Sequence, residues 1–239
     1  MKKSSSDGNP SLMGYSIDAT TEEDPLAWFS RAAGKLRTLW MARTYPFASF
    51  GKKAWAHYSC HVARSAAPYI SIGENVGLGR DVRLEVYQVP GMNAPVLILE
   101  AGSGCQRRCV ISVRNRIHVM RDVIFGPSVL VMDHARDTEE AGHLTGAKQA
   151  TGGGTIRIEE GCWIGFGAVI VSERSELVIG RHAVVGANSV VTRSIPPYSV
   201  VAGDPARIIK QYDFSEGKWV LGCIRQVQQD PEPATSALS

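Results

Sequence analysis

His134 is the residue of this sequence best placed to do chemistry. It follows Asp133 and stands directly before a segment from 135 to 155 that ends in the glycines Gly152 to Gly154. A segment of this length without repeats is usually either functional or disordered. A neutral imidazole at its start can remove a proton from a hydroxyl group near neutral pH. The sequence therefore predicts His134 as a general base, the alternative being a hydrogen-bonded polar residue at a turn.

Three further residues are candidates for assisting His134. Asp133 could hold the second imidazole nitrogen, but neighbouring residues of a strand point to opposite sides, so a backbone carbonyl could equally do so. Asn115 precedes His134 by 19 residues and is expected either to bind an acceptor or to bond a corner of the chain. His143 lies inside the loop and could contact the acceptor. The remaining histidines lack this setting and are assigned to surface or packing positions: His57, His61, His118 and His182.

The cysteines do not form a recognisable framework. They are odd in number and irregularly spaced, which predicts free and mostly buried thiols. Cys105 and Cys109 could begin a metal site, but no second pair or nearby histidine completes a set of four ligands, so no metal is expected to be required. The five are Cys60, Cys105, Cys109, Cys162 and Cys223.

The elements that must position His134 are indicated by an aliphatic residue that returns every sixth position. This period fits neither a helix nor an alternating strand and is typical of a solenoid with short flat faces. Glycine often follows the aliphatic residue, as at Gly73 and Gly165, where a tight corner would need a residue without Cβ. An ordinary β-sandwich with glycines in its hairpins is the alternative. The four runs begin at Ile72, Val113, Ile158 and Ile179.

The rest of the chain is divided around this solenoid. Residues 1–24 are polar and expected to be disordered. Residues 25–67 are expected to form a helical and irregular cap, and residues 68–206 the all-β solenoid with the loop 135–155. Residues 207–239 form a C-terminal extension.

One helix is predicted before the solenoid. The spacing of Trp28, Ala32, Leu36, Leu39 and Trp40 fits an amphipathic helix from about Pro25 to Arg43. We expect its apolar face to dock on the end of the solenoid, and the second interpretation is that it lies on an anionic membrane surface. Basic residues are concentrated in the same part of the chain: Arg31, Lys35, Arg37, Arg43, Lys52 and Lys53.

Composition excludes several classes of protein. The chain has 239 residues and 44% hydrophobic content, and no apolar run long enough to span a membrane. The first ten residues lack the apolar segment of a secretory signal. We therefore expect a cytoplasmic protein, at most peripheral at the inner face of the membrane. A net charge of +3 is too small to imply nucleic acid.

Three segments, 125–134, 162–170 and 185–207, resemble the hexapeptide-repeat acyltransferases, whose repeats wind a left-handed parallel β-helix. The last is the most specific, because Pro196-Pro197 and the run Ala202 to Arg207 resemble the final coil of that family. Handedness is implied by the resemblance alone, since crossovers between parallel strands are otherwise nearly always right-handed. The sequence departs from the family at Met120, at Arg107-Arg108 and in an enlarged bulge after Ile170.

The resemblance implies an acetyl-CoA-dependent O-acetyltransferase that acts as a homotrimer with active sites between subunits. The segments 212–214 and 218–220 resemble the branch that acetylates sugars of surface polysaccharides. Other interpretations are transfer to a small soluble acceptor such as serine, a maltose-type sugar or an antibiotic, a γ-carbonic-anhydrase-like zinc protein, or a scaffold without activity.

The resemblance also implies a coenzyme A site in a groove along the solenoid. Small corner residues would accept the pantetheine arm, an aromatic residue would border the reacting end, and cations would meet the phosphates. The implied residues are Trp163, Gly165, Phe166, Ala187, Thr192, Arg193, Arg207 and Lys210.

Overall fold

The structure is a computed structural model that describes residues 27–87, 91, 93–134 and 153–221. The segment 1–24, His143, Cys223 and most of the loop 135–155 lie outside these residues. Among the described residues, no helix is long and apolar enough to cross a membrane.

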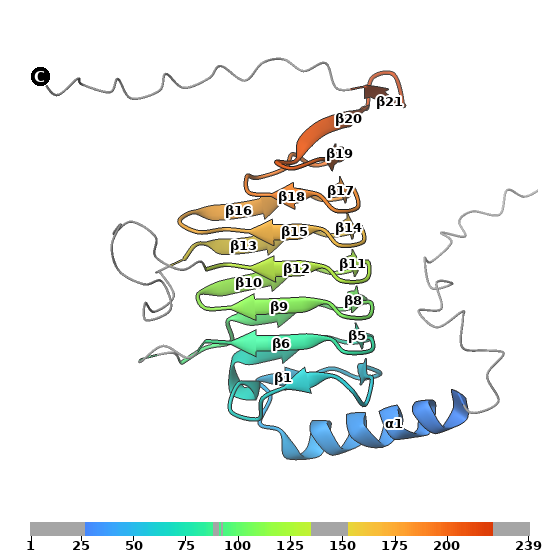
Figure 1. Cartoon of the computed structure of the whole chain (residues 1–239), viewed down its shortest axis with the longest axis vertical. Coiled ribbons are helices and arrows are strands. Elements are labelled where there is room, and N and C mark those ends of the chain that lie inside the picture. Colours follow the sequence, from blue (N-terminus) through green and yellow to red (C-terminus); the bar gives the residue numbers. More distant parts are fainter. Residues whose placement is uncertain (1–26, 88–90, 92, 135–152, 222–239) are drawn as a thin grey trace, which may run out of the picture.

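Short parallel strands form three sheets that the chain visits in turn (Figure 1). Sheet A contains β1 (Ser49–Phe50), β4 (Ile70–Ile72), β7 (Leu97–Leu99), β10 (Arg116–Val119), β13 (Thr155–Ile158) and β16 (Glu176–Ile179). Sheet B contains β2 (Trp55–Ala56), β5 (Gly77–Leu78), β8 (Gly104–Cys105), β11 (Ile124–Phe125), β14 (Trp163–Ile164), β17 (Val184–Val185), β19 (Ser199–Ala202), β20 (Arg207–Asp213) and β21 (Lys218–Leu221). Sheet C contains β3 (His61–Val62), β6 (Arg83–Val86), β9 (Val110–Val113), β12 (Leu130–Met132), β15 (Val169–Val171) and β18 (Val190–Val191).

Each coil contributes one strand to each sheet, and neighbouring coils pair in parallel. For example, β7 pairs with β4 and β10, and β12 pairs with β9 and β15. Only the last connections differ, because β20 pairs antiparallel with both β19 and β21 and so leaves the stack as a hairpin. The predicted parallel strands are confirmed, and they are arranged in three sheets.

The six-residue period marks the interior. Every aliphatic or aromatic residue of the four runs is at most 2% exposed, including Ile72, Phe125, Ile158 and Val191. Each strand therefore turns its hexad residue inward, and neighbouring coils stack these residues into one core. Burial of apolar surface of this kind is the main stabilising contribution to folding.

Glycine at the corners is explained by the close approach of successive coils. A Cβ added to Gly165 would lie 2.7 Å from the carbonyl oxygen of Val185, and one added to Gly73 would lie 2.7 Å from the amide nitrogen of Ala101. Neither distance is compatible with a side chain. At the positions that depart from the family pattern the coil continues, since the Met120 amide still donates to Ile158 O at 2.9 Å.

The sheets begin earlier than the sequence indicated. Strands β1, β2 and β3 lie between 49 and 62, within the range expected to be a cap, and they form the first coil. The six-residue period is in fact present there as Phe50, Ala56 and Val62, but no glycine follows Ala56 or Val62 to mark their corners. A short 3-10 helix (Ala67–Tyr69) precedes β4.

Helix α1 (Ala27–Thr44) lies across the N-terminal end of the stack (Figure 1). The Thr38 hydroxyl donates a hydrogen bond to Ala56 O at 3.2 Å and accepts one from Ala56 N at 3.0 Å. Met41 is fully buried. The helix is confirmed, but the prediction that its apolar face docks on the coil is wrong, because Leu36 is 69% and Leu39 60% exposed. The side that contacts the coil carries small and polar residues, which hydropathy spacing does not reveal.

Candidate active site

The candidate site lies where β12 ends. Asp133 and His134 follow Met132, the last residue of the strand, and are 0% and 5% exposed. Asp133 Oδ1 lies 3.1 Å from His134 Nδ1. The alternation that would separate neighbouring side chains no longer applies, because the chain bends out of the strand at Asp133. Asp133, rather than a backbone carbonyl, therefore holds the imidazole.

The Asp133 carboxylate is fixed by the preceding coil. Its Oδ1 accepts a hydrogen bond from the Arg114 amide at 2.7 Å, and its Oδ2 accepts from the amides of Asn115 at 2.9 Å and Arg116 at 2.8 Å. These three amides form the turn between β9 and β10. A buried carboxylate with this many donors is held in one orientation. It favours the tautomer in which Nδ1 donates and Nε2 can accept a proton.

Tyr87 covers one side of His134 and was not predicted from the sequence. The two rings meet edge to face with their centroids 4.7 Å apart, and Tyr87 is 47% exposed. Tyr87 follows β6 and His134 follows β12. Both residues therefore lie at the C-terminal ends of parallel strands of sheet C. The available signal was that each residue begins an interruption of the hexads.

The end of the long loop returns onto the same corner. Gly154 N donates to Asp133 O at 2.9 Å, and the Asn115 side-chain amide donates to Gly154 O at 3.0 Å. Gly153 has a φ of +67°, and a Cβ there would clash with Asp133 O. This geometry supports the corner-bonding role of Asn115.

The residues implied for coenzyme A form two groups. Trp163 and Phe166 are exposed by 58% and 51%, and Phe166 lies at the corner between sheets B and C with Gly165 and Ala187. The Asn188 amide donates to Phe166 O at 2.7 Å, which stacks the Ala187 corner on the Phe166 corner. The second group lines a hollow at the last coil, which contains Thr192, Arg193, Pro196, Arg207 and Ile208. Lys210 is exposed on β20 and does not line this hollow.

A single chain does not bring the Phe166 corner to His134. Phe166 precedes β15, whereas His134 follows β12, and these two strands are parallel neighbours. The two residues therefore lie at opposite ends of neighbouring strands of sheet C. A site that needs both must draw one of them from another chain.

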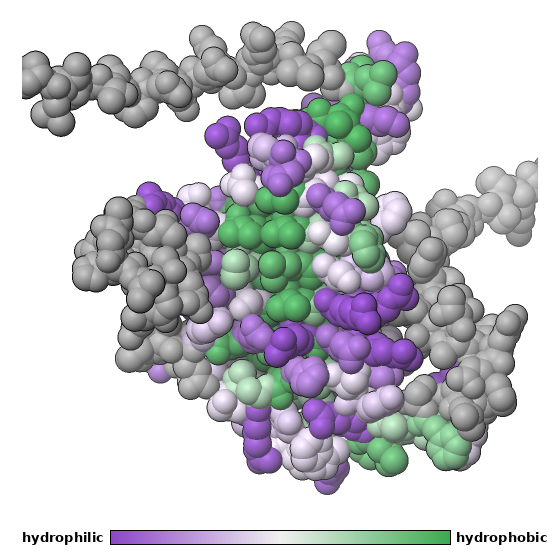
Figure 2. Space-filling view, in the orientation of Figure 1, coloured by the Kyte–Doolittle hydropathy of each residue, from purple (hydrophilic) through white to green (hydrophobic). Residues whose placement is uncertain are grey.

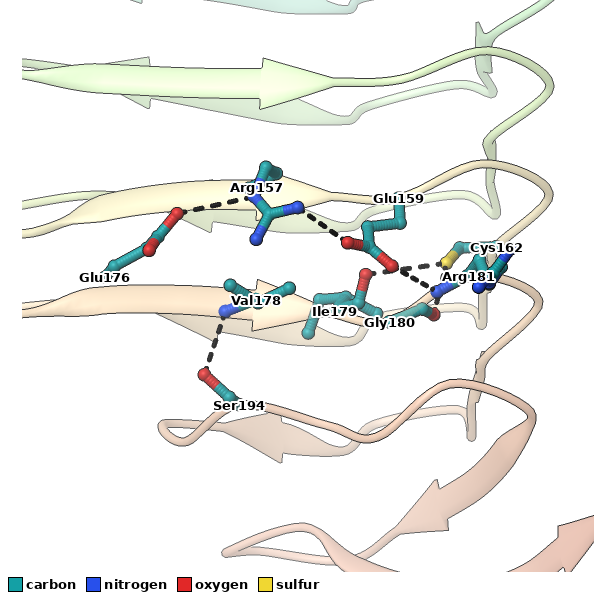
Figure 3. Close-up of polar contacts among 9 residues, drawn as sticks. All are labelled: Arg157, Glu159, Cys162, Glu176, Val178, Ile179, Gly180, Arg181 and Ser194. Atoms are coloured by element: carbon teal, nitrogen blue, oxygen red, sulfur yellow. Dashed lines mark hydrogen bonds and ion pairs between the residues drawn. The ribbon is translucent and has the colours of Figure 1, made fainter.

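The described cysteines are confirmed as free and buried. Burial raises the pKa of the Cys60 and Cys162 thiols to about 12, that of Cys109 to about 11, and that of Cys105 well above its usual range. Cys162 Sγ donates to Gly180 O at 3.1 Å inside the coil (Figure 3). Such thiols are poor nucleophiles, because the thiolate is the reactive form.

Two of the described histidines, His118 and His182, have separate partners. His118 Nε2 lies 2.7 Å from Glu100 Oε1 on sheet A, and the His182 ring packs against Tyr198. Within the described residues, no group of three or more His, Cys, Asp or Glu side chains is placed to hold a metal ion.

No protein-family model matches the chain. It is 25% identical over 168 residues to WbbJ of Escherichia coli (strain K12), which is assigned to lipopolysaccharide biosynthesis as an O-acetyl transferase. The aligned residues cover 68% of this chain and 81% of WbbJ. It is 47% identical over 55 residues to a dTDP-3-amino-3,6-dideoxy-α-D-galactopyranose 3-N-acetyltransferase of Aneurinibacillus thermoaerophilus, covering 23% of this chain and 27% of that protein. Over 68 residues it is 40% identical to serine acetyltransferase of Haemophilus influenzae, covering 28% of this chain and 24% of that protein.

The fold is shared with the N-acyltransferase AntD of Bacillus cereus. A structure of AntD with dTDP-4-amino-4,6-dideoxyglucose and coenzyme A superposes with a TM-score of 0.58 at 21% identity, over 72% of this chain and 87% of that one.

Proposed function

Because the chain is an acyltransferase of the hexapeptide-repeat family, we propose that it transfers an acetyl group from acetyl-CoA to a sugar hydroxyl, with His134 as the general base. The observation that carries the proposal is the contact between Asp133 Oδ1 and His134 Nδ1, which leaves Nε2 available. The overall similarity to WbbJ supports oxygen as the acceptor atom, and the coenzyme A bound to AntD supports the donor. The three-sheet coil would then be the left-handed β-helix of this family.

The reaction needs one proton carrier. His134 Nε2 takes the proton of the sugar hydroxyl as its oxygen attacks the thioester carbonyl. The tetrahedral oxyanion then collapses, the C–S bond breaks, and the thiolate leaves with the proton returned by the imidazolium. The products are an acetyl ester and free coenzyme A. A thioester is already activated, so the chemistry requires neither a covalent enzyme intermediate nor a metal.

The acceptor class is tested by a thiol-release assay with acetyl-CoA. We expect turnover with nucleotide-linked or polysaccharide-precursor sugars. Serine, a maltose-type sugar and an antibiotic substrate are assayed beside them, because the local similarity to serine acetyltransferase covers part of the coil. Brisk turnover of serine with none on any glycan precursor would contradict the proposal.

The donor site is proposed to include the hollow at the last coil, where Arg193 and Arg207 would bind phosphates. Arg207 is exposed and its Nη1 donates to Ala206 O at 3.1 Å, which leaves the rest of the guanidinium free for a ligand. We propose that the pantetheine arm passes Phe166 and Ala187 towards Trp163.

Replacing Arg207 with alanine is expected to raise the KM for acetyl-CoA about tenfold with little change in kcat, because one charge-assisted hydrogen bond is lost. Acetyl-pantetheine, which lacks the nucleotide, should show no difference between the two proteins. The matched control is Arg121→Ala, an exposed arginine away from the hollow. An equal rise in KM for both donors would contradict phosphate binding by Arg207.

A homotrimer is proposed because the outer faces of the sheets differ. Apolar side chains gather on the outer face of sheet C (Figure 2). On sheet A, by contrast, Arg157 bonds Glu159 at 2.6 Å and Glu176 at 3.3 Å, an arrangement suited to solvent (Figure 3). A neighbouring chain packed on sheet C could supply the Phe166 corner to His134. The apolar outward residues of sheet C lie on β9, β12, β15 and β18, whereas the outer face of β6 carries the Arg83–Glu85 ion pair at 3.6 Å; the apolar residues are Val110, Leu130, Met132, Val169, Val171 and Val190.

Replacing Val169 with aspartate is expected to convert the trimer to monomers and to abolish turnover, because a buried unpaired charge in an apolar interface is strongly destabilising. Sedimentation or light scattering measures the mass. Val178→Asp, which places the same change on the outer face of sheet A, should leave mass and activity unchanged. A Val169→Asp protein that keeps the wild-type mass would show that sheet C is not the interface.

A further inference from the structure

Helix α1 turns an apolar face away from the coil. At 100° per residue the large apolar side chains fall within an arc of about 120°. This arc is opposite to Thr38 and Met41, which contact the first coil. The exposed fractions are 58% for Trp28, 55% for Phe29, 69% for Leu36, 60% for Leu39 and 48% for Trp40.

Positive charge is concentrated at the same end of the molecule. The sequence from 25 to 73 contains seven Lys and Arg residues and no Asp or Glu, while the whole chain carries only +3. The remainder is therefore net negative. Lys35 lies at one border of the apolar face, and Arg43 falls within its arc near the end of the helix. Lys52 and Lys53 are exposed in the first coil.

We propose that α1 holds the N-terminal end of the coil on an anionic bilayer surface. The apolar face would enter the boundary between headgroups and acyl chains, where the Trp28 and Trp40 rings are favoured. The flanking cations would meet anionic headgroups, each contributing to binding at low ionic strength. A second copy of this chain fits less well, because its α1 would bring the same cations into contact. A nucleic acid would leave the apolar face exposed.

The proposal goes beyond the proposed acetyl transfer and does not depend on it. The contact surface is on α1, whereas β12 and the rest of sheet C lie along the coil (Figure 1). His134 follows β12. Turnover with a soluble sugar acceptor and vesicle binding are therefore separate measurements, and either can fail while the other succeeds.

The test is co-sedimentation of the full chain with vesicles of phosphatidylcholine, alone or mixed with phosphatidylserine. We expect binding to the mixed vesicles and its loss at high salt. Leu36→Asp should weaken binding about tenfold or more, because a charge replaces an apolar group at the interface. Lys35→Gln should weaken it about fivefold. The matched control is Leu221→Asp, a leucine that is 73% exposed on β21 at the other end of the coil, which should bind as the unmodified chain does.

Three results would overturn the proposal. One is equal binding to vesicles with and without phosphatidylserine, or no binding to either. Another is a Leu36→Asp protein that binds as the unmodified chain does. The third is a Leu36→Asp protein of lower mass in the absence of lipid, which would assign the face to a second copy. A Leu36→Asp protein with the far-UV circular dichroism spectrum and melting temperature of the unmodified chain is folded, whether or not acetyl transfer is found.

Discussion

Replacing His134 with alanine is expected to lower kcat by about 10²- to 10⁴-fold, the usual contribution of a positioned general base. Binding of coenzyme A should be unchanged, because the imidazole acts on the acceptor proton and not on the nucleotide. Thiol release measures the rate, and titration calorimetry measures coenzyme A affinity. The two measurements together separate loss of chemistry from loss of the donor site.

The control for His134 is His118→Ala. His118 also pairs with a carboxylate, with 2.7 Å between Nε2 and Glu100 Oε1, but it lies on sheet A away from the candidate site. Its replacement should leave kcat near the unmodified value. If His134→Ala kept full turnover, or if both variants lost it equally, His134 would not be the base.

Much of the fold could be predicted from the sequence, because the six-residue period of aliphatic residues identifies the residues that face inward. Ile158, Ile164 and Ile170 are buried where the period placed them. The first coil was missed since Ala56 is not followed by glycine and is smaller than Leu78 and Ile164, which stand at the same position of later coils. A small inward residue carries little periodic signal, although its backbone pairs as well as any other.

The orientation of α1 could not be read from hydropathy. Spacing identified an apolar face, and the usual assumption is that such a face is buried against the protein. Here the docked side of the helix carries the Thr38 hydroxyl bonded to the Ala56 backbone, the Arg37 guanidinium, which donates to Cys60 O at 3.4 Å, and the buried Met41. The apolar face stays exposed, so the same spacing of apolar residues is compatible with a docked face and with an exposed one.

The place of the candidate site in the sequence could be predicted, but the residues that surround His134 in space could not. His134 is identified by the loop that follows it, whereas the contact with Tyr87 depends on two insertions ending at the same edge of sheet C. The separation of Phe166 from His134 depends on which end of a strand each occupies, and only the topology gives that. These relations join distant parts of the chain, so local patterns do not contain them.

Replacing Asp133 with asparagine is expected to reduce kcat by about 10²-fold or more, because the imidazole loses the acceptor that fixes its tautomer. Asparagine keeps the shape of the side chain, but one of its two positions becomes an NH₂ donor. That group would face the Nδ1–H of His134 or the amides of Asn115 and Arg116, all of which are donors. Nitrogen NMR of the histidine ring should then show a mixture of tautomers.

The same substitution is expected to destabilise the fold by about 1–3 kcal/mol, because the part-buried amides that faced the replaced carboxylate oxygen lose their acceptor. Ile179→Ala is the matched control for stability: it removes buried methyl groups on sheet A and should cost about 2–5 kcal/mol without touching the site. Denaturant unfolding measures both. If Asp133 acts only through stability, the two variants will have similar kcat per folded molecule. If it orients His134, only Asp133→Asn will lose turnover at a temperature where both proteins are folded.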